Sequence, residues 1–295
     1  MRAALIVNPF ASNVTESRLE RVKRILGDEA EVRVLMTEGP GHAKELAELA
    51  ASEADAVFAF GGDGLFNEVV NGAGNAVPFG FVPGGGKNVF PRALGLPTGP
   101  EAATRRLVES LRAGRTRRIS LGRVNGRRFT FAAGVGFDGE LVRRVDTLGR
   151  SADGRRPGDL RFVAEMMRML ADRRWRYEPV VEIAGFGRAA FAFVANTSPY
   201  TYAGGVPIRV APEASFNSGL DLVAPVRVRP PDVPRLLAYG FLGRRASREV
   251  LYGHDLDRVE VACDTPMPLQ ADGEDLGDVD RAVFEAERDA VTVLA

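Results

Sequence analysis

The spacing of apolar residues alternates between two periods along the first third of the chain. Short apolar runs ending in Asn-Pro or in glycines, and one alternating run, have the pattern of strands: 3–7, 31–36, 56–60 and 78–82. Apolar residues at helical spacing occupy the stretches between and after them: 15–26, 41–51, 65–71 and 101–112. This alternation predicts a parallel sheet with helices on both faces.

From about residue 115 the pattern changes to short apolar runs separated by turns. These runs are 117–124, 128–133, 180–183, 189–195, 207–210 and 220–223. One helix is expected over 158–172, where Phe162, Met166 and Leu170 share a face. The tail 282–294 has strand-like runs that could pair with either half. We therefore expect an α/β fold class, with an N-terminal parallel-sheet domain followed by a β-rich antiparallel domain.

Composition narrows the class of protein. The 295 residues suffice for two modest domains. Lys+Arg and Asp+Glu both number 39, and this balance argues against a nucleic-acid partner. The single cysteine, Cys263, excludes an intrachain disulfide, and two histidines argue against a zinc site. With no signal-peptide pattern and no run of about 18 apolar residues, we expect a cytoplasmic chain that touches a membrane at most peripherally.

The sharpest motif is Gly61-Gly62-Asp63-Gly64, between a predicted strand and a predicted helix. Glycines let backbone N–H groups approach a polyphosphate, and the N-terminus of the following helix favours an anion. Asp63 would repel a phosphate directly, but it suits the Mg²⁺ ion that accompanies a nucleotide. The competing interpretation is a tight turn with a helix-capping Asp.

A second glycine segment, Gly84-Gly85-Gly86-Lys87-Asn88, also follows a predicted strand. It is not a Walker A loop, because Phe81 stands where that motif requires glycine. A flexible turn is the alternative interpretation. Ligands of parallel sheets bind at the carboxyl ends of the strands, so we expect both glycine segments to face one crevice and to share a phosphate site.

The motif Asp272-Gly273-Glu274 lies near the C-terminus. One of its carboxylates could accept the proton of an attacking hydroxyl. The residues alone favour a hairpin turn, because Asp-Gly is the commonest turn pair.

An arginine-rich segment extends over 141–176, with ten arginines against five acidic residues, and Tyr177 follows it. Together with Trp175 and the apolar helix face, it could dock on anionic lipid headgroups. A solvated charged face is the alternative interpretation.

The order of these segments resembles the diacylglycerol kinase type of lipid kinase, whose soluble bacterial members share a catalytic domain with sphingosine and ceramide kinases. The most diagnostic stretch is 61–72, Gly-Gly-Asp-Gly-Leu-Phe-Asn-Glu-Val-Val-Asn-Gly. The other matching segments are 8–9, 37–43, 83–92, 133–138, 194–196, 211–212, 218–221 and 272–274. Each segment is a weak signal by itself, but the ordered series covers nearly the whole chain.

The resemblance implies a kinase that uses ATP and Mg²⁺ to phosphorylate the hydroxyl of a lipid such as diacylglycerol or a sphingoid base. It implies a nucleotide-binding domain over 1–115 and a lipid-substrate domain over 116–275, with ATP between them and strands at 276–295 folding back onto the first. The implied nucleotide contacts are Asn8, Pro9, Thr37, Gly61, Gly62, Asp63, Gly64, Leu65, Phe66, Asn67, Glu68, Gly84, Gly85, Gly86, Lys87 and Asn88. The implied proton acceptor is Glu274, with Asp272 as the alternative, and the implied metal ligands are Asp63 and Asp221.

Three departures from the family pattern bear on activity. Leu65 replaces a usual Thr, as in sphingosine-kinase-like members. Gly86 stands where a Thr is usual, which removes a hydroxyl donor worth about 1 kcal/mol. The loop Asn217-Ser218-Gly219 replaces Asp-Asp-Gly, and this puts the structural Mg²⁺ of some members in doubt.

Two alternatives to a lipid kinase stay open on the sequence. One is a kinase for a soluble metabolite, related to NAD kinase, which shares the glycine-Asp-glycine loop. The other is a nucleotide- or lipid-binding homologue without turnover. Contact with the membrane surface and a homodimer are both compatible with the sequence, which does not specify the acceptor.

Overall fold

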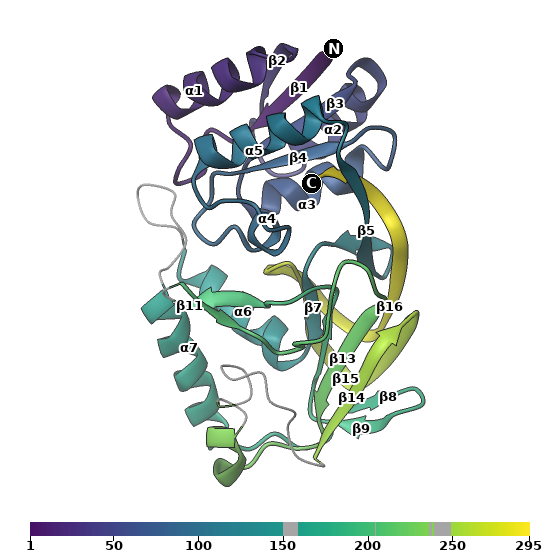
Figure 1. Ribbon diagram of the computed structural model, residues 1–295. Helices are drawn as coiled ribbons and strands as arrows, with labels where there is room; N and C mark the ends of the chain where they lie inside the picture. The colour runs from purple at the N-terminus through teal and green to yellow at the C-terminus, as the bar shows by residue number, and fades with distance from the viewer. Residues whose placement is uncertain (150–158, 204, 236–237, 239–248) are drawn as a thin grey trace. The chain divides into compact units, whose positions relative to one another are not determined.

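The computed structural model describes residues 1–149, 159–203, 205–235, 238 and 249–295 (Figure 1). Contacts between residues divide the chain into two compact units. Unit 1 is Met1–Ser120 with Arg288–Ala295, and unit 2 is Leu121–Glu287. No helix in the described ranges is both long and apolar enough to cross a membrane.

Unit 1 contains a parallel sheet with the strand order β2-β1-β3-β4 (Figure 1). Its strands are β1 (Arg2–Val7), β2 (Glu31–Met36), β3 (Ala56–Gly61) and β4 (Phe79–Pro83), which confirms the four strands expected from the sequence. β3 and β4 are buried along their whole length, as central parallel strands are. The last residues of β16 (Glu274–Leu294) join this sheet, since Val293 pairs with Phe79.

The helices of unit 1 flank these strands in pairs, α1 on α5 and α2 on α3 (Figure 1). They are α1 (Glu16–Gly27), α2 (His42–Glu53), α3 (Asp63–Gly72), α4 (Val89–Ala93) and α5 (Pro100–Arg112). α1 begins at Thr15, whose hydroxyl accepts from the Arg18 N–H at 3.3 Å. α3 begins two residues earlier than expected, so that Asp63 and Gly64 form its first turn.

Unit 2 is built on antiparallel strands in the order β14-β13-β10-β7-β15-β16. β5 (Thr116–Val124) begins in unit 1 and enters unit 2 at Leu121. The other strands are β6 (Arg127–Phe129), β7 (Ala132–Val135), β8 (Val181–Ile183), β9 (Gly187–Ala189), β10 (Ala192–Ala195), β11 (Thr201–Ala203), β12 (Val206–Ile208), β13 (Leu220–Pro225), β14 (Val250–Leu256) and β15 (Arg258–Ala271). Each of the six expected apolar runs overlaps a strand. Buried side chains of β5 to β10, β13, β15 and β16 form a core, which includes Phe129, Val194 and Phe284.

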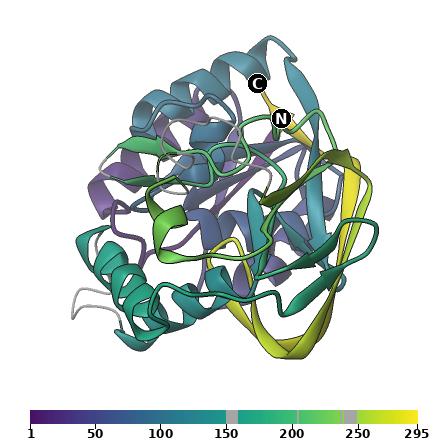
Figure 2. The same ribbon diagram turned by 90° about the horizontal axis from the view of Figure 1, so that it is seen from below.

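β15 and β16 form the long bent hairpin drawn in yellow-green and yellow (Figure 2). The register shifts twice, between Ala262 and Met267 and between Pro268 and Gln270. Such bulges bend a strand and increase its twist. The bent end of this hairpin carries the motif at 272–274.

Unit 2 also contains α6 (Phe137–Thr147), α7 (Asp159–Asp172) and a short 3-10 helix, η1 (Pro230–Asp232). The expected helix over 158–172 is confirmed as α7. The expectation of a single helix in this half was wrong, because α6 follows β7 directly. Its core face, Leu141, Val142 and Val145, has helical spacing that the sequence already displayed.

Candidate functional site

The predicted nucleotide residues of unit 1 follow the carboxyl ends of its four parallel strands. Asn8 follows β1, Thr37 follows β2, and the two glycine segments end β3 and follow β4. In the β3–β4 register Gly61 lies opposite Pro83, and the Gly84 N–H donates to the Gly61 carbonyl at 2.6 Å. The two glycine segments therefore lie side by side at one edge of the sheet.

The contact between the glycine segments is so close that it excludes side chains. A Cβ atom on Gly85 would lie 2.7 Å from the Gly62 Cα, and one on Gly84 would lie 3.0 Å from the Gly61 Cα. Gly86 differs from its neighbours, because a Cβ there would meet nothing within 4 Å. The first two glycines of the second segment are therefore required by packing, whereas Gly86 is not.

Asp63 connects the two glycine segments through its carboxylate. Oδ2 accepts from the Val89 N–H at 3.0 Å, and Oδ1 accepts from the Phe90 N–H at 2.9 Å. These N–H groups belong to the first turn of α4, where helical N–H groups lack intrahelical partners. The capping interpretation of Asp63 is thus correct in kind, but the helix it caps is α4 and not its own.

Asparagines shape the rest of this loop cluster. The Asn88 side chain, at a backbone φ of 50°, accepts from the Gly85 N–H and donates to the Gly85 carbonyl, both at 2.8 Å. The Asn13 side chain donates to the same carbonyl at 2.8 Å. The Asn8 side chain accepts from the Phe10 N–H at 2.9 Å. Asn13 was missed from the sequence, since its partner lies 72 residues away.

Not every side chain of the diagnostic stretch is exposed. Phe66 is fully buried and packs edge-on against Phe81, so its side chain belongs to the core. The nucleotide contact predicted at this position stays a prediction. The Glu68 carboxylate accepts from the Ala43 N–H, in the first turn of α2, at 3.1 Å. Gly86 and Lys87 are exposed, and Thr37 and Asn67 are buried.

The donor set at this edge of the sheet suits a metal ion that arrives with a nucleotide. Among the described residues, no group of three or more His, Cys, Asp or Glu side chains could hold a metal by itself. Mg²⁺ at nucleotide sites is usually held by one or two carboxylates, waters and phosphate oxygens. Asp63 supplies one such carboxylate among the glycine segments.

In unit 2 the Asp272-Gly273 pair forms the hairpin turn between β15 and β16, as the residues alone favoured. Ala271 pairs with Glu274, and Asp272 and Gly273 both have positive φ, 50° and 77°, as a type I′ turn requires. The Asp272 carboxylate accepts from the N–H groups of 130–132 at 2.6, 2.9 and 3.3 Å, and from the Thr130 hydroxyl at 2.8 Å. Asp272 therefore anchors the turn.

The Glu274 carboxylate lies at the first position after this turn. It forms an ion pair with Arg127, and its side chain is 32% exposed. Of the two predicted proton acceptors, Glu274 is thus the one that solvent or a ligand reaches, while Asp272 is buried.

A buried carboxylate that the sequence analysis did not single out lies close to the same turn. Asp138, near the start of α6, accepts from the Tyr200 hydroxyl at 2.6 Å and from the Gln270 side-chain amide. Burial raises the pKa of Asp138 to about 6, and these two hydrogen bonds oppose the shift. In the sequence, Asp138 is marked only by its place in the segment 133–138, which matches the family pattern.

The second predicted metal ligand, Asp221, has a fully buried side chain on β13. Its carboxylate accepts from the His254 ring at 2.8 Å, the Tyr252 hydroxyl at 3.1 Å and the Asp255 N–H at 3.2 Å. These three donors make Asp221 a hydrogen-bond centre that joins β13 and β14. Its role as a metal ligand stays a prediction.

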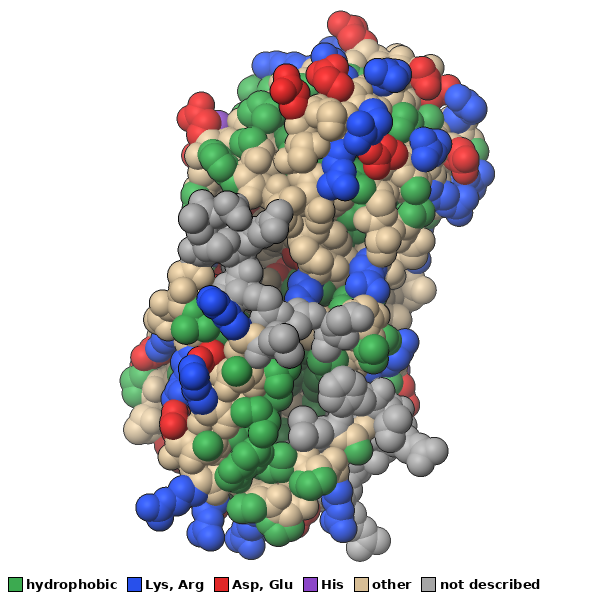
Figure 3. Space-filling view, turned by 90° about the vertical axis from the view of Figure 1, so that its left-hand side faces the viewer, with side chains coloured by type: hydrophobic (Ala, Val, Ile, Leu, Met, Phe, Trp, Pro, Cys, Tyr) green, Lys and Arg blue, Asp and Glu red, His purple; other side chains and the backbone are tan. Residues whose placement is uncertain are grey.

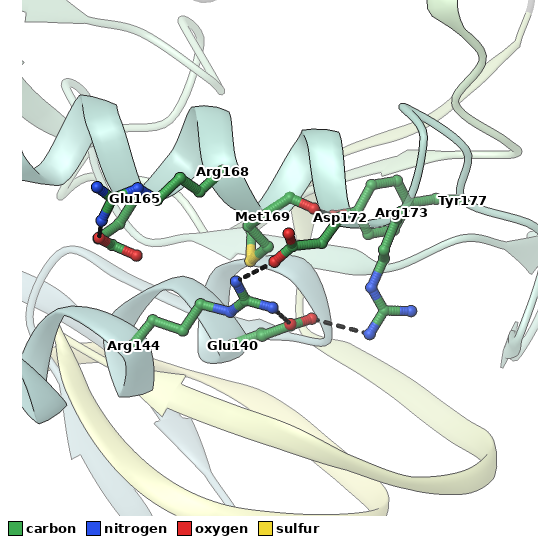
Figure 4. Close-up of polar contacts among 8 residues, drawn as sticks. All are labelled: Glu140, Arg144, Glu165, Arg168, Met169, Asp172, Arg173 and Tyr177. Carbon is green, nitrogen blue, oxygen red and sulfur yellow. Dashed lines mark hydrogen bonds and ion pairs between the residues drawn. The ribbon is translucent and has the colours of Figure 1, made fainter.

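Several arginines of the arginine-rich segment form ion pairs within unit 2 (Figure 4). Arg144 on α6 bonds Glu140 at 2.8 Å and Asp172 on α7 at 2.7 Å. Arg173 bonds Glu140 at 2.9 Å and lies over the Tyr177 ring. These contacts fasten α7 to α6. Arg150, Arg155 and Arg156 lie outside the described residues.

Beyond these pairs, α7 exposes apolar side chains. Val163 and Met167, one helical turn apart, are 42% and 39% exposed. Arg161, on another side of the helix, and Arg174 and Arg176, which follow its last residue, are exposed as well. In Figure 3 apolar side chains gather on this part of unit 2, with Lys and Arg side chains at its lower end.

Both halves of the chain match known families. Residues 2–124 match the diacylglycerol kinase catalytic domain, and residues 132–295 match the YegS C-terminal NAD kinase beta sandwich-like domain. The chain is 30% identical over 233 residues to a diacylglycerol kinase of Bacillus subtilis, covering 77% of this chain and 73% of the relative. It is 36% identical over 146 residues to one of Staphylococcus epidermidis, covering 45% of this chain and 43% of that relative.

Solved structures share the fold. A diacylglycerol kinase from Bacillus anthracis superposes with a TM-score of 0.71 at 19% identity, covering 99% of this chain and 96% of the other. An NAD kinase from Archaeoglobus fulgidus in complex with ATP superposes with a TM-score of 0.54 at 14% identity, covering 99% and 93%. At such identities the likeness concerns the fold alone. The matches in sequence identify more: the chain belongs to the diacylglycerol kinase family and is a kinase.

Proposed function

We propose that this kinase transfers the γ-phosphoryl group of ATP to the hydroxyl of a lipid, with diacylglycerol or a sphingoid base as the acceptor class. The observation that carries the proposal is the pair of glycine segments that touch at the carboxyl ends of β3 and β4, tied together by Asp63. Backbone N–H groups without side chains around them are the means by which such loops hold a polyphosphate. The diacylglycerol kinases among the relatives support the lipid acceptor.

The residues divide the work of phosphoryl transfer. The segments 61–64 and 84–88 would bind the triphosphate, with Lys87 exposed beside them to add positive charge. Glu274 would accept the proton of the lipid hydroxyl as its oxygen attacks phosphorus. Mg²⁺, when bound with ATP beside Asp63, would neutralise charge on the phosphate oxygens. Positioning and charge neutralisation supply most of the rate in such reactions.

The decisive experiment measures ATP turnover with diacylglycerol and with sphingosine in mixed micelles. We expect turnover with at least one of these lipids and a loss of about 10²-fold or more in the variant Asp63→Ala. The matched control is Asp55→Ala, which removes a carboxylate that accepts from the Arg2 N–H at the edge of the same unit. Unchanged turnover in Asp63→Ala would refute the role of Asp63.

The same assay separates the remaining alternatives. The fold shared with an NAD kinase makes NAD the soluble acceptor to test. Transfer to NAD and to no lipid would replace the lipid proposal by a soluble-metabolite kinase. Tight ATP binding without transfer to any acceptor would indicate a binding protein.

A further inference from the structure

The first turn of α6 packs so closely against β7 and β15 that glycine is needed at the positions of contact. A Cβ atom on Gly134 would lie 2.9 Å from the Asp138 carboxylate, and one on Gly139 would lie 2.4 Å from the Pro268 carbonyl oxygen. The Gly136 N–H also donates to that carbonyl at 2.9 Å. Asp138 is therefore held against β7 and β15 with little freedom to move.

Asp138 begins a chain of hydrogen bonds that ends at the turn preceding Glu274. The Tyr200 hydroxyl donates to Asp138 Oδ1 at 2.6 Å, and Gln270 Nε2 donates to Oδ2. Gln270 Oε1 then accepts from the Gly273 N–H at 2.9 Å. Gln270 has no exposed surface, so solvent does not compete for these bonds.

The direction of this chain is fixed by chemistry. A backbone N–H only donates, so the Gln270 oxygen must face Gly273, and its NH₂ group must face Asp138. Asp138 then accepts from Gln270 at Oδ2 and, as a carboxylate, from Tyr200 at Oδ1. Burial raises the pKa of Asp138 only to about 6, and the group is therefore mainly ionised near neutral pH.

We propose that Asp138 and Gln270 are positioning residues for phosphoryl transfer: they hold the Asp272-Gly273 turn so that the Glu274 carboxylate is correctly placed to accept the proton. This inference rests on the proposed function. The turn is then fixed from two sides, by Gln270 on the Gly273 N–H and by Asp272 on the backbone of 130–132. A displacement of about 1 Å in a reacting group lowers a rate by about 10²-fold.

Among the described residues, no cationic side chain acts on the pKa of the buried Asp138 carboxylate, and this supports a role beyond packing. The groups that act on the Asp138 pKa besides burial are Tyr200 and Gln270, and neither carries a positive charge. Such a group opposes folding when ionised, whereas an apolar residue of similar size would not. Strongly perturbed carboxylates of this kind concentrate at functional sites.

The proposal is tested by removing the Gln270 amide and by exchanging it with the Asp138 carboxylate. Gln270→Leu removes both the NH₂ group that donates to Asp138 and the oxygen that accepts from the Gly273 N–H, and so breaks the chain. The double variant Asp138→Asn/Gln270→Glu restores it. The amide introduced at position 138 accepts from Tyr200 and donates to the carboxylate introduced at position 270, which accepts from the Gly273 N–H. Charge and volume are nearly those of the wild type. Glu182→Gln, on the exposed middle of β8, is the matched control for an acid–amide exchange.

We expect Gln270→Leu to lower kcat with the accepted lipid by about 10²-fold and to leave the KM for ATP within about twofold. The double variant should recover most of kcat, and Glu182→Gln should match the wild type. An unchanged kcat in Gln270→Leu, or no recovery in the folded double variant, would overturn the proposal.

A second measurement does not depend on turnover. Hydrogen exchange of the Gly273 amide should be faster in Gln270→Leu and slow again in the double variant. Equal exchange in all three proteins would overturn the chain itself. If the wild type phosphorylates no lipid while Gly273 exchange follows this pattern, the proposed function fails and the hydrogen-bond chain stands.

Discussion

Asp272 and Glu274 are two carboxylates on either side of one glycine, and their surroundings assign them different tasks. Asp272 is buried, and its oxygens accept from three backbone N–H groups and a hydroxyl. Its charge is therefore already stabilised, which makes it a poor proton acceptor. Glu274 is partly exposed and held by Arg127. The hydrogen bonds thus favour Glu274 for proton transfer and Asp272 for the shape of the turn.

Isosteric amides separate these two tasks. Glu274→Gln should lower kcat by about 10²–10⁴-fold, because general-base catalysis is worth that much, and should change the free energy of unfolding by no more than about 1 kcal/mol. Asp272→Asn should destabilise the protein by about 2–4 kcal/mol, because an amide NH₂ faces backbone N–H groups. Turnover assays and urea unfolding measure the two effects. A stable Asp272→Asn variant with no turnover would reverse the assignment.

Asp138 predicts a specific dependence of stability on pH. Its pKa is about 6 in the folded protein and 3.8 in the reference state, so its contribution to stability is complete below about pH 4 and is lost as pH rises through 6. The groups facing it are Tyr200 and Gln270. We expect the stability difference between Asp138→Asn and wild type to shift in favour of the variant by about 1–2 kcal/mol between pH 5 and 7 and then to level. A pH-independent difference in urea unfolding would contradict this.

At the scale of elements, the two glycine segments at the ends of β3 and β4 are in contact and together form one surface. Gly85 packs against Gly62, and the helix after each segment begins within or directly after it. The segments are therefore coupled, and a change in one displaces the other. Gly86 lies in the same segment without such a neighbour.

Neighbouring glycines provide a matched test of this coupling. Gly85→Ala should raise the KM for ATP by about tenfold or more and destabilise unit 1 by about 1–3 kcal/mol, because its Cβ would lie 2.7 Å from the Gly62 backbone. Gly86→Ala should leave both quantities nearly unchanged. ATP kinetics and thermal unfolding give the comparison. Equal effects of the two substitutions would show that packing does not distinguish them.

Recognition of the elements from the sequence succeeded where local periodicity was strong. The four parallel strands, the strands that overlap the six later apolar runs, and α1, α2, α3, α5 and α7 were found within a few residues, because their apolar patterns are regular. β11, β14 and β15 were not among the expected strands. α4 is only five residues long and owes its first turn to the carboxylate of Asp63, which belongs to another segment. α6 was missed because the glycines directly before it are typical of a turn, although its own helical pattern is ordinary.

At the scale of the whole molecule, the question is how a chain without a membrane-spanning helix in its described ranges would reach a lipid. Pairing within the α6–α7 cluster removes Arg144 and Arg173 from the basic surface that the sequence suggested. What remains for an anionic bilayer is the exposed apolar pair Val163 and Met167 on α7, with exposed arginines before and after it in the sequence, Arg161, Arg174 and Arg176. We propose that this face of α7 docks on anionic lipid.

Vesicle binding tests the docking face. Val163→Glu/Met167→Glu should weaken binding to phosphatidylglycerol vesicles by about tenfold or more, since it removes apolar contact and adds two negative charges. Val206→Glu is the control, because Val206 is 53% exposed on β12, away from this helix in the sequence. Binding should also weaken with added salt. Wild-type binding that does not exceed that of the α7 variant would refute the docking face.

The sequence by itself determined the class of the fold, the order of its segments and the family. Strand and helix periods, glycines after strands and the Asp-Gly turn are local properties of the chain. They can therefore be recognised in the sequence before the fold is known. Tertiary structure decided which chemistry each side chain is free to perform. It joined Asp63 to α4, buried Phe66 in the core, surrounded Asp221 with donors and connected Asp138 to Gly273 through Gln270. These contacts link residues that are mostly far apart in the chain. Burial and hydrogen bonding between such residues depend on the folded arrangement, and a local sequence pattern does not specify that arrangement.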